Sequence, residues 1–177
     1  MEPLRFWKPL DRAELPVLEW VEGVRFGGVV EDATRVLTWA GEHGDVWYLL
    51  AGSAALFDKP RRGEWLRAAA AVAAVYGLST ALKFILRRRR PPVASIGAET
   101  QLSFPSSHAV TSFAAARIFS AIAPAGRPLL YVGAVSVTGS RLHFCVHYPS
   151  DLLAGALLGD LAGRAVVATM PPLASHS

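Results

Sequence analysis

The sequence predicts an all-α protein: a polytopic membrane helical bundle of about five spanning helices with an N-terminal amphipathic interfacial helical segment. Two observations predict this class. Of the 177 residues, 52% are hydrophobic and 18% are charged, against about 25% in ordinary soluble domains, and the mean hydropathy is +0.32. Apolar stretches of helical length alternate with short turns, whereas strand patterning is weak. Disorder is therefore excluded and an ordinary soluble enzyme disfavoured, with a buried soluble helical bundle as the alternative.

The N-terminal segment, residues 1–44, has the pattern of surface helices rather than of a span. Through residues 14–40, apolar side chains recur on one helical face and charged side chains occupy the other. The pair Gly27-Gly28 divides this stretch into two helical pieces. We expect the segment to lie on a membrane or to cap a bundle. Its first apolar stretch is broken by glutamates, so no secretory signal is expected there.

The bundle itself is expected over residues 45–170, followed by a flexible tail at 171–177. Its candidate spans are the apolar stretches at residues 45–57, 68–82, 105–123, 128–141 and 149–170. None of them has the run of about eighteen uncharged apolar residues typical of a membrane helix. Charges interrupt the later spans, so Arg117, Asp160 and Arg164 must face the bundle interior or a boundary.

Cysteine, charge and tryptophan content narrow the class further. The single cysteine, Cys145, rules out an intrachain disulfide and a multi-cysteine metal site. The net charge of +4 suits an anionic partner, but basic residues do not interleave with aromatics, so nucleic acid is not an expected partner. All five tryptophans lie in the first 65 residues, as an interfacial belt or as ordinary core aromatics.

Chemistry is concentrated in polar segments at the ends of apolar stretches, namely residues 83–92, 104–109 and 140–151. In an up-and-down bundle, successive helix ends alternate between the two sides. The first segment follows the second span, the second begins the third span, and the last joins the fourth span to the fifth. All of them therefore meet at one face of the membrane.

These segments supply groups that suit an anionic phosphoryl group. Lys83, Arg90 and Arg141 would converge on one anion as fixed cations. Ser106 and Ser107 begin a helix, where free backbone N–H groups and the helix dipole favour a phosphate. The combination predicts a phosphate-binding site.

Two histidines add the reactive groups. Pro149 suits the first turn of a helix, which places Asp151 close behind His147 and within reach of its ring. A carboxylate there fixes the imidazole tautomer and stabilises the charged ring. With His108 as the second histidine, the set predicts phosphoryl transfer through a covalent phosphohistidine, and arginine can provide the charge stabilisation without a metal.

In these motifs the chain resembles the type 2 phosphatidic acid phosphatase family, the membrane lipid phosphate phosphatases. The family signature is K-x6-R-P, P-S-G-H and S-R-x5-H-x3-D. The chain matches it in order at residues 83–91, 105–108 and 140–151, and the resemblance covers about residues 45–170. Ser107 departs from the signature glycine, at a position where a left-handed backbone would disfavour serine.

The resemblance implies a role for each matched residue. His147 would be the nucleophile and Asp151 its orienting partner. His108 would protonate the leaving alcohol and then activate water. The phosphoryl oxygens would be held by the remaining matched residues, Lys83, Arg90, Ser106, Ser107 and Arg141.

The implied activity is metal-independent, cofactor-free hydrolysis of a lipid phosphomonoester or pyrophosphate. Polyprenyl phosphates and pyrophosphates, phosphatidic acid and phosphatidylglycerol phosphate all remain open as substrates. The expected partners are the lipid phosphate and membrane lipids, with a homo-oligomer left open. The alternatives are a vanadate-dependent haloperoxidase, a soluble periplasmic phosphatase, and a non-catalytic protein that binds acidic lipid through Arg87–Arg90.

Neighbouring charged and histidine residues have simpler interpretations. Arg87, Arg88 and Arg89 are expected to form a solvated, charged helix end. His143 lies four residues before His147, but Pro149 disfavours one continuous helix that would hold both as a metal pair.

Charge counting predicts a cell-membrane protein whose site faces outward. Arg90 and Arg141 are set aside as phosphate ligands, which leaves three basic residues, Arg87–Arg89, on the site face. The opposite face carries six, namely Lys59, Arg61, Arg62, Arg67, Arg127 and Arg164. The positive-inside rule then places the opposite face in the cytoplasm and the site on the extracytoplasmic face.

Overall fold

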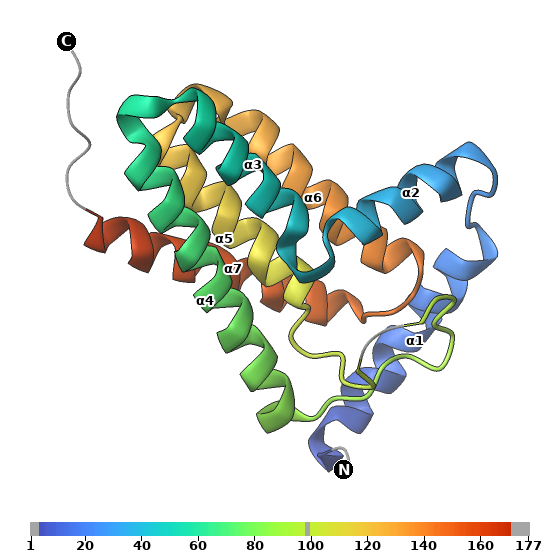
Figure 1. The fold of residues 1–177 in the computed structure, drawn as a ribbon. Helices are drawn as coiled ribbons and strands as arrows, with labels where there is room; N and C mark the ends of the chain where they lie inside the picture. Colours follow the sequence, from blue (N-terminus) through green and yellow to red (C-terminus); the bar gives the residue numbers. More distant parts are fainter. Residues whose placement is uncertain (1–3, 98–99, 171–177) are drawn as a thin grey trace.

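The chain forms helices that gather around one central helix, as shown by a computed structural model that describes residues 4–97 and 100–170 (Figure 1). The helices are α1 (Lys8–Gly23), α2 (Val29–Ala40), α3 (Asp45–Phe57), α4 (Arg62–Leu86), α5 (Ser107–Ile122), α6 (Arg127–His143) and α7 (Pro149–Thr169). Short 3-10 turns lie at Arg5–Trp7, Glu42–Gly44, Lys59–Arg61 and Pro124–Gly126. Within the described residues no strand forms, which confirms the all-α prediction. The predicted tail at 171–177 lies outside the described residues.

The apolar stretches expected over residues 45–170 all form helices, α3 to α7. α4 extends beyond the predicted stretch 68–82 at both ends. Two helical segments of the described chain, Lys59–Leu86 and Pro149–Thr169, are long and apolar enough to cross a membrane. The 13 residues of α3 rise only about 20 Å, less than the roughly 30 Å of a bilayer core.

α5 is the centre of the bundle, with α4, α6 and α7 packed against it (Figure 1). Its sequence is rich in alanine and other small or apolar residues, and 10 of its 16 residues are buried. A helix that is apolar on every side must be surrounded by protein or lipid. Two tryptophans pack edge-on against Phe119 of α5, Trp65 at 5.5 Å and Trp47 at 6.3 Å between ring centroids.

α7 approaches α5 closely because glycines line the contact, at Gly155, Gly159 and Gly163. A Cβ atom at Gly155 would lie 2.9 Å from the Ser106 carbonyl oxygen, and one at Gly159 or Gly163 would also collide with α5. Small residues four apart allow two helix backbones to approach in this way. As a result the start of α7 meets the start of α5, where the Ser106 N–H donates to the Asp151 carbonyl at 3.2 Å.

The N-terminal segment forms two helices, as expected, and the break lies at the predicted joint. α1 ends at Gly23 and α2 begins at Val29, directly after Gly28 with a φ of 62°. α1 begins at Lys8, earlier than the expected start near residue 14, and runs beside the loop that follows α4 (Figure 1). The indole N–H of Trp7 donates to the Leu86 carbonyl at 2.7 Å, so α1 is attached to the end of α4.

The outer surface of the bundle is strongly apolar. Large side chains such as Phe57, Leu129 and Leu49 are 88%, 78% and 72% exposed on α3 and α6. Apolar surface of this extent suits lipid better than water. Of the two interpretations of the tryptophans, core packing describes Trp7, Trp47 and Trp65, which are buried, whereas Trp20 and Trp39 are exposed.

Candidate active site

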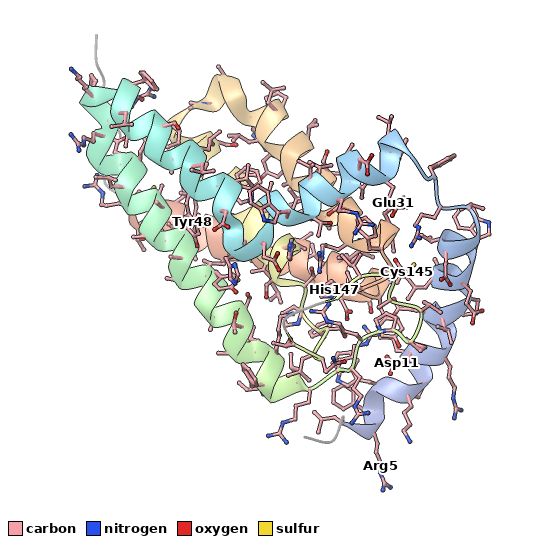
Figure 2. The ribbon with its side chains drawn as sticks, turned by 45° about the vertical axis from the view of Figure 1, so that its right-hand side comes forward. Arg5, Asp11, Glu31, Tyr48, Cys145 and His147 are labelled. Atoms are coloured by element: carbon pink, nitrogen blue, oxygen red, sulfur yellow. The ribbon has the colours of Figure 1, made fainter. Side chains whose placement is uncertain are left out.

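A small cavity lies where α4 ends, α5 begins and α6 ends. Its volume is about 60 Å³, far below the roughly 300–1,000 Å³ of pockets for drug-sized ligands. The space therefore suits a compact chemical group. Six of the eight predicted site residues line it, namely Lys83, Arg90, Ser107, His108, Arg141 and His147. In Figure 2, His147 lies at the junction between the bundle and α1, which carries Asp11.

The cavity's cations are held by backbone carbonyls. Nζ of Lys83 donates to the carbonyls of Pro105 and Ser103 at 2.8 and 3.3 Å. The guanidinium of Arg90 donates to two loop carbonyls at 2.7 and 2.8 Å. These contacts fix the positions of both charges without neutralising them.

No carboxylate among residues 4–97 and 100–170 forms an ion pair with Lys83, Arg90 or Arg141. Arg141 is 4% exposed, and its Nε has no hydrogen-bond partner within the described chain. Glu42 lines the cavity and attracts Arg141 electrostatically without pairing with it. Burial lowers the pKa of Arg90 to about 10, which reflects the cost of holding its charge away from water. Three desolvated cations in one small space favour a multiply charged anion.

The start of α5 supplies further donors to the cavity. No side chain caps this helix, so the first backbone N–H groups, at Ser107 and His108, are available to an anion. Ser107 is the first residue of the helix and has no positive φ, so the left-handed backbone considered from the sequence does not occur there. The Ser107 hydroxyl accepts from Ser79 at 3.2 Å. Ser106 is fully buried behind the helix start and does not line the cavity.

The His147 ring lies between a cation and a carboxylate. Nη1 of Arg90 lies 3.1 Å from Nε2, and Oδ2 of Asp151 lies 3.5 Å from Nδ1. A guanidinium can only donate, so Nε2 accepts and the ring proton lies on Nδ1, toward the carboxylate. Burial lowers the pKa of His147 well below its ordinary value, and the charges of Lys83, Arg90 and Arg141 lower it further. The imidazole is therefore neutral, with its Nε2 lone pair directed at Arg90.

His108 is oriented by α2, a contact that the sequence did not indicate. Its Nε2 lies 3.2 Å from the Thr38 carbonyl, which can only accept, so Nε2 carries a proton. The Thr38 hydroxyl donates to Ser140 at 2.8 Å, next to Arg141. Gly41 lets the chain pass close by, because a Cβ there would lie 3.0 Å from Cδ2 of His108. No local motif in α2 marks Thr38, so only the tertiary structure identifies this role.

The prediction that Arg88 is a solvated charge is wrong. Its side chain has 0% exposure, whereas Arg89 is exposed and Arg87 is half-buried. α4 ends at Leu86 and the chain continues extended, with an isolated bridge between Arg89 and Leu102. In extended backbone alternate side chains share a face, so Arg88 and Arg90 both turn inward.

Behind His147, Arg88 contacts carboxylates from two helices. Its guanidinium donates to Asp151 of α7 at 2.6 Å, and to Asp11 and Glu14 of α1 at 2.8 and 2.6 Å. It also lies 4.0 Å above the Tyr148 ring. The second oxygen of Asp151 accepts the Tyr148 N–H at 2.9 Å, so both carboxylate oxygens are held.

A helical metal pair of His143 and His147 does not form, since α6 ends at His143 and His147 lies in the following loop. Across the described chain, no three His, Cys, Asp or Glu side chains come together as metal ligands. Cys145 is buried against Leu18 and Tyr148.

Comparison with known proteins identifies related chains. The model of the PAP2 superfamily matches residues 64–174. A decaprenylphosphoryl-5-phosphoribose phosphatase of Mycobacterium tuberculosis is 38% identical over 136 residues, which cover 75% of this chain and 76% of the relative. The corresponding phosphatase of Mycolicibacterium smegmatis is 35% identical over 150 residues, covering 81% and 82% of the two chains.

A solved structure shares the fold. The transmembrane PAP2-type phosphatidylglycerolphosphate phosphatase of Bacillus subtilis superposes with a TM-score of 0.74 at 20% identity. The superposition covers 93% of this chain and 89% of that one. It therefore includes the N-terminal helices, which the family model does not reach.

Proposed function

The chain belongs to the PAP2 superfamily and is a hydrolase of phosphoric esters, and from this premise we propose that it is an integral membrane phosphatase that acts through a phosphohistidine. One observation supports this mechanism above the others. His147 lines a cavity of about 60 Å³ together with three cations that lack carboxylate partners among the described residues, and its Nε2 lies 3.1 Å from one of them, Arg90. A phosphate dianion would balance most of that charge.

In the first proposed step, Nε2 of His147 attacks phosphorus and the bond from phosphorus to the leaving oxygen breaks. His108 gives a proton to that oxygen, and its Nδ1 is the atom for this transfer because Nε2 is held by Thr38. Arg90 transfers its N–H contact from His147 to the phosphoryl oxygens. The cations and the α5 amides stabilise the negative charge that develops there.

In the second proposed step, water attacks the phosphohistidine and His108 accepts its proton. The nitrogen–phosphorus bond breaks, which releases inorganic phosphate and restores neutral His147. Asp151 faces Nδ1 throughout and stabilises the positive ring of the intermediate. The charge stabilisation in both steps comes from side chains and amides, so we expect no metal requirement.

The substrate that the comparisons favour is a polyprenyl-linked sugar phosphate, since both mycobacterial relatives are named for decaprenylphosphoryl-5-phosphoribose. In such a substrate the scissile group is a terminal phosphate, which fits a small cavity. The apolar outer face of α4, with Leu78 60% and Ile85 64% exposed, would accommodate the prenyl chain in the bilayer.

We propose that the bundle crosses the membrane several times, with α1 at the interface and the site on the extracytoplasmic side. Within the bundle the count supports this side, with six basic residues on the opposite face against Arg87–Arg89. The N-terminal segment adds Arg5, Lys8 and Arg12 beside the site end, so the orientation rests on the loops of the bundle alone. In intact cells, a cysteine from Gly97→Cys should react with an impermeant maleimide, and one from Gly126→Cys only after lysis. The reverse labelling would place the site in the cytoplasm.

The test of the activity is phosphate release by purified protein in detergent. We expect release from polyprenylphosphoryl-5-phosphoribose, retention of activity in EDTA, and inhibition by vanadate, a phosphate mimic. Phosphatidic acid and phosphatidylglycerol phosphate serve as competing substrates. Release from none of them would overturn the proposal, and activity that EDTA abolishes and one divalent metal restores would overturn its metal-free mechanism.

A further inference from the structure

Helix α1 reaches the catalytic machinery through Arg88, and we infer that Arg88, held by Asp11 and Glu14, is a positioning residue for Asp151 and hence for His147. This inference rests on the proposed function. α1 lies outside the residues 64–174 that the family model matches, so the family signature does not assign it this role.

The contacts of Arg88 leave its guanidinium no freedom. Nη1 donates to Asp151 Oδ1 and to the Ser150 hydroxyl, both at 2.6 Å, while Nη2 and Nε donate to Glu14 and Asp11. Bidentate and charge-assisted hydrogen bonds of this length are strong and directional. The Asp151 carboxylate is thereby fixed at the start of α7.

Glu14 makes the connection two-sided. One carboxylate oxygen accepts from Arg88 at 2.6 Å and from the Ser150 hydroxyl at 2.8 Å, and the other accepts the Ser150 N–H at 2.7 Å. Glu14 therefore binds both Arg88 and the first turn of α7, which carries Asp151. Movement of α1 would disturb the carboxylate that faces His147.

The remaining charged groups around His147 lie on its other side. Lys83 of α4, Arg90 of the loop, Arg141 of α6 and His108 of α5 line the cavity with it. Loss of Arg88 would leave the Asp151 charge without its cation, and an unneutralised carboxylate favours the charged imidazolium. A histidine that is protonated at higher pH loses its nucleophilic lone pair.

The experiment compares Arg88→Ala with Arg89→Ala, the exposed neighbour, and Glu14→Gln with Glu19→Gln, an exposed glutamate of the same helix. We expect Arg88→Ala to lower kcat at least tenfold with little change in KM, and to move the acidic limb of the kcat profile to higher pH. Arg88→Lys should not restore activity, because an ammonium lacks the planar fork. Glu14→Gln should lower kcat several-fold, and both controls should match the wild type.

The outcomes separate the two proposals. An inactive wild type would overturn the proposed function and this role with it. An active wild type with an active Arg88→Ala protein would overturn the positioning role alone. A lower kcat with an unmoved acidic limb would overturn the positioning role and leave Arg88 a purely structural residue. A defect in folding reduces the amount of active protein, which lowers the height of the pH profile but does not shift it along the pH axis.

A groove at the opposite end of the bundle carries a second, independent inference. α6 and α7 both pack on α5 but touch each other little, and between them lies a cavity of about 550 Å³. It is lined by Arg117 of α5, Arg127 and Tyr131 of α6, and Asp160 and Arg164 of α7. We propose that this groove binds the headgroup of an anionic phospholipid.

The charges of the groove are unequal. Asp160 accepts from Arg164 at 2.7 Å and from the Tyr131 hydroxyl at 3.0 Å, and Arg117 also reaches Tyr131. Asp160 is the single carboxylate among the groove's described lining residues, whereas arginines number three, so the net charge is positive. Within a membrane bundle such arginines mark a site for an anion or a pairing partner.

The position of the groove favours a lipid as that anion. Leu157 lines it and is 66% exposed, and the next turn of α7 exposes Leu161 by 60%. An acyl chain can lie along these leucines while the phosphate meets the arginines. In the orientation proposed above this end faces the cytoplasm, where anionic lipids attract basic residues.

The test measures thermal unfolding in neutral detergent with vanadate saturating the active site. Phosphatidylglycerol should raise Tm of the wild type, whereas phosphatidylcholine and inorganic phosphate should not. Arg127→Gln, an exposed change, and Arg117→Gln should lose this shift, and Arg62→Gln, an exposed arginine of α4 outside the groove, should keep it. Equal shifts with phosphatidylcholine, a shift retained in Arg127→Gln, or stabilisation only at high protein concentration, as for a second copy, would overturn the proposal.

Discussion

The two sides of His147 carry similar charges in opposite arrangements. On the cavity side, Lys83, Arg90 and Arg141 have no ion-pair partner among the described residues. On the far side, Arg88 lies among three carboxylates at 2.6 to 2.8 Å. In the proposed mechanism a phosphate would supply the counter-charge for the first group, whereas Arg88 already has its carboxylate partners within the fold. Of the two arginines separated by one residue, Arg90 is the one proposed to bind the ligand, whereas Arg88 holds carboxylates of α1 and α7 in place.

The largest expected effect concerns the ring between the two sides. His147→Ala should lower kcat at least about 1,000-fold, because the nucleophile is lost. His108→Ala should lower it by roughly 100- to 10,000-fold, as expected for an acid–base group, with substrate binding retained. The measurement is phosphate release, and His143→Ala, outside the cavity, is the control that should keep wild-type activity. More than a few per cent of activity in His147→Ala would show that the nucleophile is assigned wrongly.

The cavity side can be tested without disturbing the fold. Arg141→Gln should lower kcat/KM by roughly 100- to 1,000-fold, since it removes a donor to the developing phosphoryl charge. Its free energy of unfolding should not fall, because an unpaired buried charge is costly to keep. Arg88→Gln should instead lower stability, since carboxylates are left buried without their cation. Equal destabilisation of Arg141→Gln and Arg88→Gln in thermal unfolding would contradict the distinction between unpaired cations on the cavity side and a paired arginine on the far side.

The pH dependence gives a finer test. His147 must be neutral to attack, and burial with three nearby cations lowers its pKa below the ordinary 6.5. Below the lowered pKa the ring is protonated, so kcat/KM should persist below pH 6.5 and decline only in more acidic solution. Because His108 must be protonated, the whole profile should be bell-shaped. Arg90→Gln removes one cation and should move the acidic limb to higher pH. A wild-type limb at or above pH 6.5 would contradict this assignment.

A smaller effect is expected from substitutions at the close contact between α5 and α7, which positions both sides of His147. Gly159→Ala places a methyl group against the backbone of α5, and overpacking of this kind costs about 1–3 kcal/mol of unfolding free energy. Gly139→Ala is the matched control, since a Cβ at Gly139 meets no atom within 4 Å, and alanine there should leave stability unchanged or raise it by up to about 1 kcal/mol. Similar stability of the two variants in thermal unfolding would show that α5 and α7 can separate freely.

The sequence was sufficient for much of the fold because helix ends carry local signals. Proline and glycine turns mark the boundaries of α3, α5, α6 and α7, and the Gly27-Gly28 joint was visible directly. The start of α1 at Lys8 was missed because its first turns lack a clear apolar face. The positions of six site residues around one cavity followed from motif spacing and from the alternation of helix ends.

Contacts between distant segments could not be predicted in this way. Arg88 looked like part of a solvated run, since a count of charges does not show that the helix stops at Leu86 and the chain turns extended. Thr38 acts through its backbone carbonyl, which has no sequence signature. Ser106 matched the signature but lies behind the cavity, because the register at the start of α5 gives Ser107 the position at the cavity.

The central claim is that His147 becomes phosphorylated during turnover, with the cations of the cavity on one side of its ring and Asp151, held by Arg88, on the other. The most direct measurement is rapid quenching of the wild type with labelled lipid phosphate in alkaline solution, followed by peptide mass spectrometry. The account predicts one acid-labile phosphoryl group on His147, absent from His147→Ala and accumulated in His108→Ala supplied with a substrate that has a good leaving group. Turnover with no phosphorylated protein, or with the label on another residue, would contradict it.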